Sequence, residues 1–207
     1  MAYYHKSPAF LFKITMANVK LDIPLSEESV RALKVGDAVF LTGRIYTARD
    51  AAHKYLAGKP DLTRVPDFRN GAIYHCGPVI VKENGNWRVT AAGPTTSSRE
   101  EPYEAFVIEK YGIRAIIGKG GMGKATLEAC RRFGCVYLHA IGGAAQVLAN
   151  AVQQVSAVHF LEEFGAPEAI WQFEVKDFPA VVTMDAAGHS LHAQVLEQSL
   201  TQFEKLK

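Results

Sequence analysis

The sequence predicts a single α/β domain, residues 1–207, in which a mixed sheet in two layers carries helices on its outside. Three observations predict this fold class. The first hundred residues are rich in short strand patterns, and the second half alternates strand and helix patterns in a βαβα order. A chain of 207 residues that is 48% hydrophobic is also long enough to bury a core without disulfides or metal ions.

The first half contains clear helix and turn signals. Ser26 is a good N-cap for a helix at residues 26–33, and Thr47 is expected to cap a second helix that runs to about residue 56. Pro102 is a suitable first residue for a helix that reaches residue 111, and residues 60–71 have a loop composition. Strands are expected at residues 21–24, 38–46 and 72–76, and, on either side of an Asn84-Gly85 hairpin turn, at 79–82 and 87–90.

The second half begins with the βαβα pattern and closes with a helix. Its strands are expected at residues 114–117, 135–140, 171–175 and 180–184, the last two separated by Pro179. Its helices are expected at residues 124–133, 144–154 and 191–206, the last being amphipathic.

Composition excludes several classes of function. The net charge of +2 gives no reason to expect a nucleic acid or a membrane surface as partner, and no apolar run approaches the roughly 18 residues of a membrane span. Three cysteines are too few for a disulfide framework, and the first residues contain no signal peptide, so we expect a cytoplasmic protein. We expect Cys76, Cys130 and Cys135 to be small buried hydrophobes, and His75 and His139 to be core histidines.

The glycine-rich segment 118–126 allows three interpretations. Gly118, Gly123 and Lys124 fit a P-loop, but Ala125 stands where the Mg²⁺-binding hydroxyl should be. Gly118, Gly120 and Gly123 also fit a dinucleotide loop, but no acidic residue ends the next strand. The third interpretation is a glycine loop at a helix N-terminus, which either binds a small anion or is only a tight turn.

Three basic side chains share one position in the predicted fold. Arg49, Arg99 and Lys119 each lie on a loop at the end of a strand, accompanied by hydroxyl groups at residues 95–98 and by glycine N–H groups. Each could equally be part of a solvated turn. If the three loops converge, they would form a pocket for a small dianion such as a dicarboxylate.

Several segments together resemble a known family. Residues 42–53, 71–78, 93–96 and 117–123 are similar to the β subunit, or C-terminal domain, of class I fumarases and to the related β subunit of L-tartrate dehydratase. The resemblance runs from about residue 21 to 194. It implies a swivelling β/β/α domain with mixed sheets and outer helices, which works with a larger α subunit as a heterotetramer with two of each subunit.

The resemblance also implies a cofactor and a reaction. The α subunit would carry a 4Fe–4S cluster with one iron open to the substrate as a Lewis acid, and this chain would bind no metal itself. The enzyme would be a hydro-lyase that interconverts fumarate and L-malate. Fumarate is preferred to tartrate as the substrate because residues 140–145 are more similar to the fumarase branch of the family. The alternatives are a tartrate dehydratase subunit that forms oxaloacetate, a P-loop-like nucleotide-binding protein, and a non-catalytic binding module.

The family pattern assigns roles to residues of this chain. Thr95 matches the hydroxyl proposed as the catalytic base, Arg49 and Arg99 match carboxylate-binding arginines, and Lys119 matches the lysine of the glycine loop. Residues 97–101 depart from the pattern because they contain more acids than expected. Supporting roles fall to Asp50, His53, Thr96 and Gly120.

Overall fold

The computed structural model describes residues 17–206. Seven strands form one mixed sheet in the order β1-β2-β3-β6-β7-β9-β8, and an additional pairing of β2 with β9 closes five of them, β2, β3, β6, β7 and β9, into a barrel. These strands are β1 (Asn18–Asp22), β2 (Ala38–Thr47), β3 (Ala72–Tyr74), β6 (Ala115–Gly118), β7 (Val136–His139), β8 (Val152–His159) and β9 (Ile170–Met184). The mixed α/β class is confirmed, and the closure of the sheet is an addition to the prediction.

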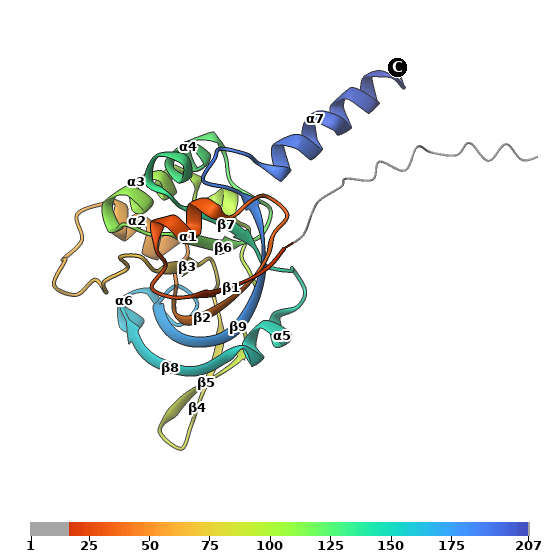
Figure 1. Cartoon of the computed structure of the whole chain (residues 1–207). Helices are drawn as coiled ribbons and strands as arrows, with labels where there is room; N and C mark the ends of the chain where they lie inside the picture. Colours follow the sequence, from red (N-terminus) through yellow and green to blue (C-terminus); the bar gives the residue numbers. More distant parts are fainter. Residues whose placement is uncertain (1–16, 207) are drawn as a thin grey trace, which may run out of the picture.

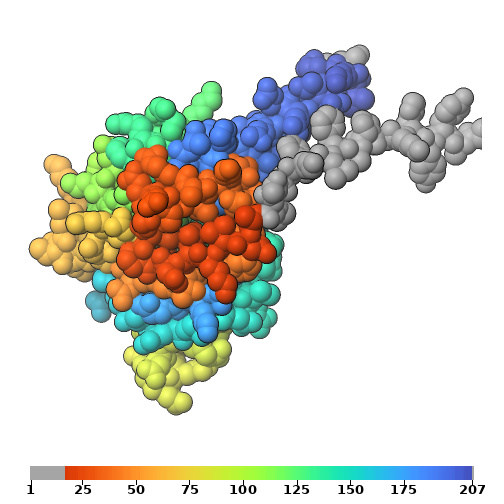
Figure 2. All heavy atoms as spheres, viewed as in Figure 1, coloured from red at the N-terminus to blue at the C-terminus, as the bar shows by residue number. Residues whose placement is uncertain are grey.

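Helices lie on the outside of the barrel (Figure 1). They are α1 (Glu27–Ala32), α2 (Asp50–Ala57), α3 (Glu101–Tyr111), α4 (Lys124–Phe133), α5 (Ala145–Asn150), α6 (Leu161–Phe164) and α7 (Leu191–Glu204), with a 3-10 turn η1 (Ser97–Arg99). The hairpin β4 (Val79–Glu83) and β5 (Asn86–Ala91) projects at one end, and α7 extends away from the body near the other (Figures 1 and 2). Within the described residues, no helix is both long and apolar enough to cross a membrane.

Two long strands close the barrel. Parallel pairs join β2 to β3, β3 to β6 and β6 to β7, whereas β9 runs antiparallel to both β7 and β2. Because β2, β3 and β6 are parallel neighbours, their carboxyl ends meet at one edge of the barrel. The loops that follow these strands therefore emerge side by side.

Alternation along the strands separates two cores. Tyr74, Ile117 and Leu138 belong to a cluster with residues from the other barrel strands, and this cluster fills the barrel. Their neighbours Ile116 and Tyr137 belong to a second cluster, which packs under α2, α3 and α4. This period of two is the pattern of strands buried on both faces.

Most of the predicted elements are confirmed. Ser26 caps α1 by accepting a hydrogen bond from the backbone N–H of Ser29 at 3.0 Å. Asn84 and Gly85 turn the β4–β5 hairpin with φ values of 50° and 84°, as a type I′ turn requires. The helix predicted at residues 124–133 has the observed bounds of α4, and residues 60–71 contain no helix or strand.

Several predicted element boundaries are wrong. The first strand, predicted at residues 21–24, is β1 at Asn18–Asp22, and the strand predicted at residues 72–76 ends at Tyr74. Thr47 does not cap α2, because it is the last residue of β2 and its hydroxyl donates to the Ala169 carbonyl, while Arg49 occupies the N-cap position. The helix predicted at residues 144–154 ends at Asn150, and β8 begins two residues later. Pro179 does not divide β9, which continues from Ile170 to Met184. The irregularity in this strand lies at Asp177, which has a φ of 50° and where the pairing with β2 shifts register.

Candidate active site

Three loops meet at the carboxyl ends of β2, β3 and β6. Arg49 and Asp50 follow β2, and Lys119 follows β6. The loop that contains Thr95 is joined to the ends of β3 and β6 by two isolated β-bridges, Cys76 with Pro94 and Thr96 with Lys119. The fold thus brings together, from distant parts of the sequence, the residues that were predicted to form a dianion site.

Thr95 and Lys119 lie on adjacent backbones. The Thr95 N–H donates to the His75 carbonyl at 2.6 Å, and the Lys119 N–H donates to the Thr95 carbonyl at 3.3 Å. Both side chains are partly exposed, and neither the Thr95 hydroxyl nor the Lys119 ammonium has a hydrogen-bond or ion-pair partner among the described residues. Exposed Thr96 and Gly120 flank them. This pair is free to contact a solute.

Arg99 is held by Asp50. Its Nε donates to Asp50 Oδ1 at 3.1 Å, and its Nη2 contacts Asp50 Oδ2, so the pair is bidentate. The Arg99 side chain remains 53% exposed. This pair links the η1 turn to the first residue of α2.

Arg49 is held by an acid that the sequence did not reveal. Its Nε lies 3.4 Å from Glu168 Oε1, while Glu168 Oε2 accepts a hydrogen bond from the Ala51 N–H at 3.0 Å. Gly77 lies directly against the guanidinium, where a Cβ would collide with it. Glu168 precedes β9 and belongs to no motif, so only the fold could identify it.

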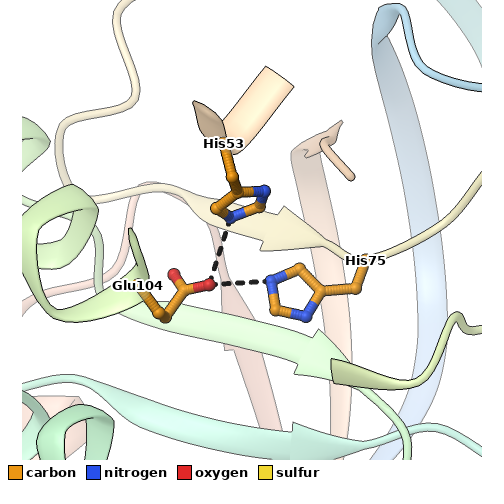
Figure 3. A group of neighbouring side chains, drawn as sticks. All are labelled: His53, His75 and Glu104. Atoms are coloured by element: carbon orange, nitrogen blue, oxygen red, sulfur yellow. Dashed lines mark hydrogen bonds and ion pairs between the residues drawn. The ribbon is translucent and has the colours of Figure 1, made fainter. Parts of the chain in front are cut away.

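His53 does not reach the surface of the site; it lies beneath it with His75 and Glu104 (Figure 3). The Nε2 atoms of both histidines approach the same oxygen, Glu104 Oε2, at 3.1 Å for His53 and 2.9 Å for His75. All three side chains are fully buried. His75 is thus a hydrogen-bonded core histidine, as expected.

Burial and charge act in opposite directions on this cluster. Burial alone would raise the pKa of Glu104, but the two adjacent histidines lower it to about 2. Burial lowers the pKa of His75. Burial also disfavours the charged form of His53, but Glu104 and Glu100 outweigh it, so the pKa of His53 is raised. Burial raises the pKa of Glu100 to about 7.

The described residues offer one group of donors with metal-ligand character, namely His53, His75 and Glu104, whose ligand atoms lie within 4.8 Å of one another. Both Nδ1 atoms have protein partners, Arg49 O at 3.0 Å for His53 and Ser97 Oγ at 2.9 Å for His75, and His75 Nε2 is hydrogen-bonded to Glu104. Among the described residues, however, His53 Nε2, Glu104 Oε1 and both carboxylate oxygens of Glu100 are buried without a hydrogen-bond partner.

The cysteines are buried, as predicted, and do not fit an iron–sulfur cluster. Cys76 belongs to the core inside the barrel, whereas Cys130 and Cys135 belong to the core under the helices. Burial raises the pKa of the Cys76 thiol to about 12 and the pKa of Cys135 well above its ordinary value. Cluster ligands converge on one point, and these three cysteines lie in two separate cores.

The N-terminus of α4 is already filled by a carboxylate of this chain. Glu101 accepts hydrogen bonds from the Gly123 N–H at 2.6 Å, from the Ala125 N–H at 3.2 Å and from the Thr126 hydroxyl at 2.7 Å. These are the groups that a P-loop would offer to phosphate. A carboxylate thus lies at this helix terminus, as the anion-binding interpretation expects, but it belongs to the chain itself. The tight turn is confirmed by the positive φ of Gly120, 82°.

Comparisons with known proteins show the family of this chain. Residues 4–195 match the family model described as "Fumarase C-terminus". The chain is 54% identical over 190 residues to the "Putative fumarate hydratase class I" of Geobacillus stearothermophilus, covering 91% of this chain but only 36% of that protein.

Two further relatives are named as tartrate dehydratase subunits. The chain is 45% identical over 174 residues to the "Putative L(+)-tartrate dehydratase subunit beta" of Methanocaldococcus jannaschii, covering 83% of this chain and 89% of that protein. It is 38% identical over 177 residues to the L(+)-tartrate dehydratase subunit beta of Escherichia coli (strain K12), covering 84% and 86%. The chain thus spans about a third of the first relative's length and most of the two tartrate subunits.

Proposed function

Because the chain belongs to the fumarase C-terminus family, we propose that it is the β subunit of an iron–sulfur hydro-lyase that reversibly hydrates fumarate to L-malate. The observation that carries this proposal is the meeting of Thr95, Arg99 and Lys119 at one exposed edge of the barrel. A free hydroxyl and cationic groups at one edge suit a small dicarboxylate.

In this proposal Arg49 and Arg99 bind the two carboxylates of the substrate. In the dehydration direction, Thr95 takes the proton from C3 of malate, the C2–O bond breaks, and the electrons of the C3–H bond form the double bond. A threonine hydroxyl is a weak base, so its alkoxide needs a cation nearby. Lys119, on the neighbouring backbone and without an internal partner among the described residues, is the group placed to supply it.

The rest of the active site belongs to a partner. The exposure of Arg99 and the internal pairing of both arginines support a site that is completed by a second wall. We assign that wall to an α subunit in a cytoplasmic heterotetramer with two of each subunit. A 4Fe–4S cluster held by the α subunit would supply the Lewis acid that helps the hydroxyl group leave.

The test is an anaerobic purification of the tagged chain with the proteins that bind it, followed by assays for loss of fumarate and for formation of oxaloacetate from L-tartrate. We expect an iron-containing partner and turnover of fumarate. Thr95→Val, which removes only the hydroxyl, should lower kcat at least about 100-fold, the usual range for loss of a general base. Ser199→Ala removes an exposed hydroxyl from α7, outside the loops of the site, and should leave kcat unchanged.

Tartrate is the second candidate substrate, because two of the relatives are tartrate dehydratase subunits. The higher identity to the fumarate hydratase favours fumarate. Turnover of tartrate without turnover of fumarate would decide for the second candidate. A chain that captures no partner and turns over neither substrate would instead be a binding module that has kept the fold.

A further inference from the structure

A one-way chain of hydrogen bonds runs from Tyr137 to Glu104. The Tyr137 hydroxyl donates to Ser97 Oγ at 2.8 Å, Ser97 Oγ lies 2.9 Å from His75 Nδ1, and His75 Nε2 lies 2.9 Å from Glu104 Oε2. All four side chains are buried. Burial raises the pKa of Tyr137, so it keeps its proton and donates. At the other end, the ionised Glu104 can only accept, so the single proton of the neutral His75 ring lies on Nε2 and its Nδ1 accepts the proton of Ser97.

The partners of His53 require a different protonation state. Its Nδ1 lies 3.0 Å from the Arg49 carbonyl, which can only accept, so Nδ1 carries a proton. Its Nε2 lies 3.1 Å from Glu104 Oε2 in an ion-pair contact that lacks the geometry of a hydrogen bond. An unprotonated nitrogen would turn its lone pair toward this ionised carboxylate and repel it, so Nε2 also carries a proton and the ring is an imidazolium.

The other groups around His53 are compatible with a positive charge. Glu104 and Glu100 face it from α3 and from the residue just before that helix, with Glu100 Oε2 at 3.7 Å from Nδ1. The ring of His75 packs edge-on against it with centroids 5.0 Å apart, and its neutral state avoids repulsion. Asp50, at the start of α2, adds negative charge near this cluster.

This arrangement ties two separate segments of the site to one carboxylate. His53 holds the Arg49 carbonyl with both its backbone N–H, at 2.8 Å, and its Nδ1. His75 holds the other segment, because its carbonyl accepts from the Thr95 N–H and its ring binds Ser97. We propose that Glu104 is a positioning residue that fixes Arg49 relative to Thr95 through one charged and one neutral histidine. Its effect on turnover rests on the function proposed above.

Gly118 lies so close to the hydrogen-bond chain from Tyr137 to Glu104 that a side chain at this position would collide with it. A Cβ at this position would overlap Ser97 Oγ and would lie 3.0 Å from the Tyr137 hydroxyl and 3.3 Å from His75 Nδ1. Gly118 directly precedes Lys119, so the same glycine that admits the hydrogen-bond chain also begins the loop that carries the free ammonium. The glycine-rich motif therefore has a role that phosphate binding does not explain.

The first test uses the full chain alone and needs no enzymatic activity. In ¹⁵N NMR of the histidine rings at pH 6 to 8, we expect both nitrogens of His53 to be protonated and His75 to be the neutral Nε2–H tautomer. In Glu104→Gln, His53 should lose a proton by pH 8, and the amide signals of Thr95 and Arg49 should shift. Glu109→Gln, the same change at an exposed position of α3, is the control and should shift neither.

Three results of this test would overturn the proposal. The first is a neutral His53 ring in the unsubstituted chain. The second is that the amide signals of Thr95 and Arg49 do not shift in Glu104→Gln. The third is that elemental analysis finds one equivalent of zinc or another divalent metal, with the ring nitrogens as its ligands. The last result would make the cluster a metal site.

The second test uses the assembled enzyme. A displacement of about 1 Å at a catalytic group can cost about 100-fold, so Glu104→Gln should lower kcat/KM by about 10- to 100-fold, with Glu109→Gln unchanged. The loss should shrink as the pH falls from 8 to 6, because a reprotonated His53 can donate to the amide oxygen of the introduced side chain; a purely structural defect would not recover. An equal loss at all pH values would overturn the positioning role. If the unsubstituted complex turns over neither substrate, the proposed function fails, while the NMR test still decides the proton arrangement.

Discussion

Removing the Glu101 carboxylate should destabilise α4 and turn its N-terminus into an anion site. Glu101 accepts from the backbone N–H groups of Gly123, Ala125 and Thr126 and from the Thr126 hydroxyl. In Glu101→Ala these donors lose their acceptor, and the positive end of the helix dipole loses its counter-charge. The substitution places a good helix former at the first position of α3, so α3 itself should be little affected.

The expected loss follows from these contacts. Loss of a capping side chain costs about 0.5–2 kcal/mol, and loss of a carboxylate at a partly buried helix N-terminus costs up to about 2 kcal/mol. Together they give about 1–4 kcal/mol. For a chain of this size, each kcal/mol corresponds to about 2–4 °C, so the thermal midpoint should fall by about 2–15 °C.

Thermal unfolding with and without sulfate tests this account of the glycine loop. Sulfate should stabilise Glu101→Ala more than the unsubstituted chain, because only the variant has open N–H groups; at ten times its dissociation constant the extra gain is about 1.4 kcal/mol. Glu109→Ala, with its side chain exposed on the same helix, controls for the general effect of sulfate. Equal midpoints for the two variants, or an equal response to sulfate, would refute the assignment of Glu101 as the internal anion.

Three further outcomes are expected. Gly118→Ala should lower the free energy of unfolding by about 1–3 kcal/mol, because its methyl group overlaps Ser97 Oγ; an unchanged denaturant midpoint would contradict this. Burial raises the pKa of Glu100 to about 7, so the ionised form that prevails above this pH opposes folding. The thermal midpoint of Glu100→Gln should therefore exceed that of the unsubstituted chain by more at pH 8 than at pH 5. Asp50→Asn should lower KM of the assembled enzyme, because Asp50 no longer competes with the substrate for Arg99, and should lower kcat, because Arg99 is no longer oriented. Steady-state kinetics that match those of the unsubstituted enzyme would refute this role.

The elements with local signals could be predicted from the sequence. The Asn84-Gly85 turn, the Ser26 cap and the glycines on either side of α4 each act within a few residues of their own position. The strand β8 was missed because its valines at 152, 155 and 158 recur every three residues, a spacing that also fits a helix, whereas the segment pairs with β9 as a strand. Closure of the barrel depends on the pairing of β2 with β9, more than a hundred residues apart, which no local pattern records.

The residues of the candidate site were likewise predictable from the sequence only in part. Arg49 and Lys119 follow β2 and β6, whose parallel order brings these two loops to one edge, whereas Thr95 and Arg99 follow the separate β4–β5 hairpin and reach that edge through the bridges of Pro94 with Cys76 and of Thr96 with Lys119. Their acidic partners were not predictable, because Glu168 contacts Arg49 only through the tertiary fold. The acids at residues 100 and 101 were noted as a departure from the family pattern, and the structure gives each a place, one beside His53 and one at the start of α4.

The internal pairing of both arginines bears on how the site would work. An exposed ion pair such as that between Arg99 and Asp50 contributes at most about 1 kcal/mol, so a substrate carboxylate can replace Asp50 at little cost. The pair nevertheless holds the guanidinium at the edge where the loops of β2, β3 and β6 meet, which reduces the entropy lost when the substrate binds. Burial of the pair by a partner subunit would strengthen every charge in the site, because the dielectric falls as water leaves. If a partner subunit supplies a second wall as proposed, the affinity of this edge for a carboxylate should rise sharply when that wall is added.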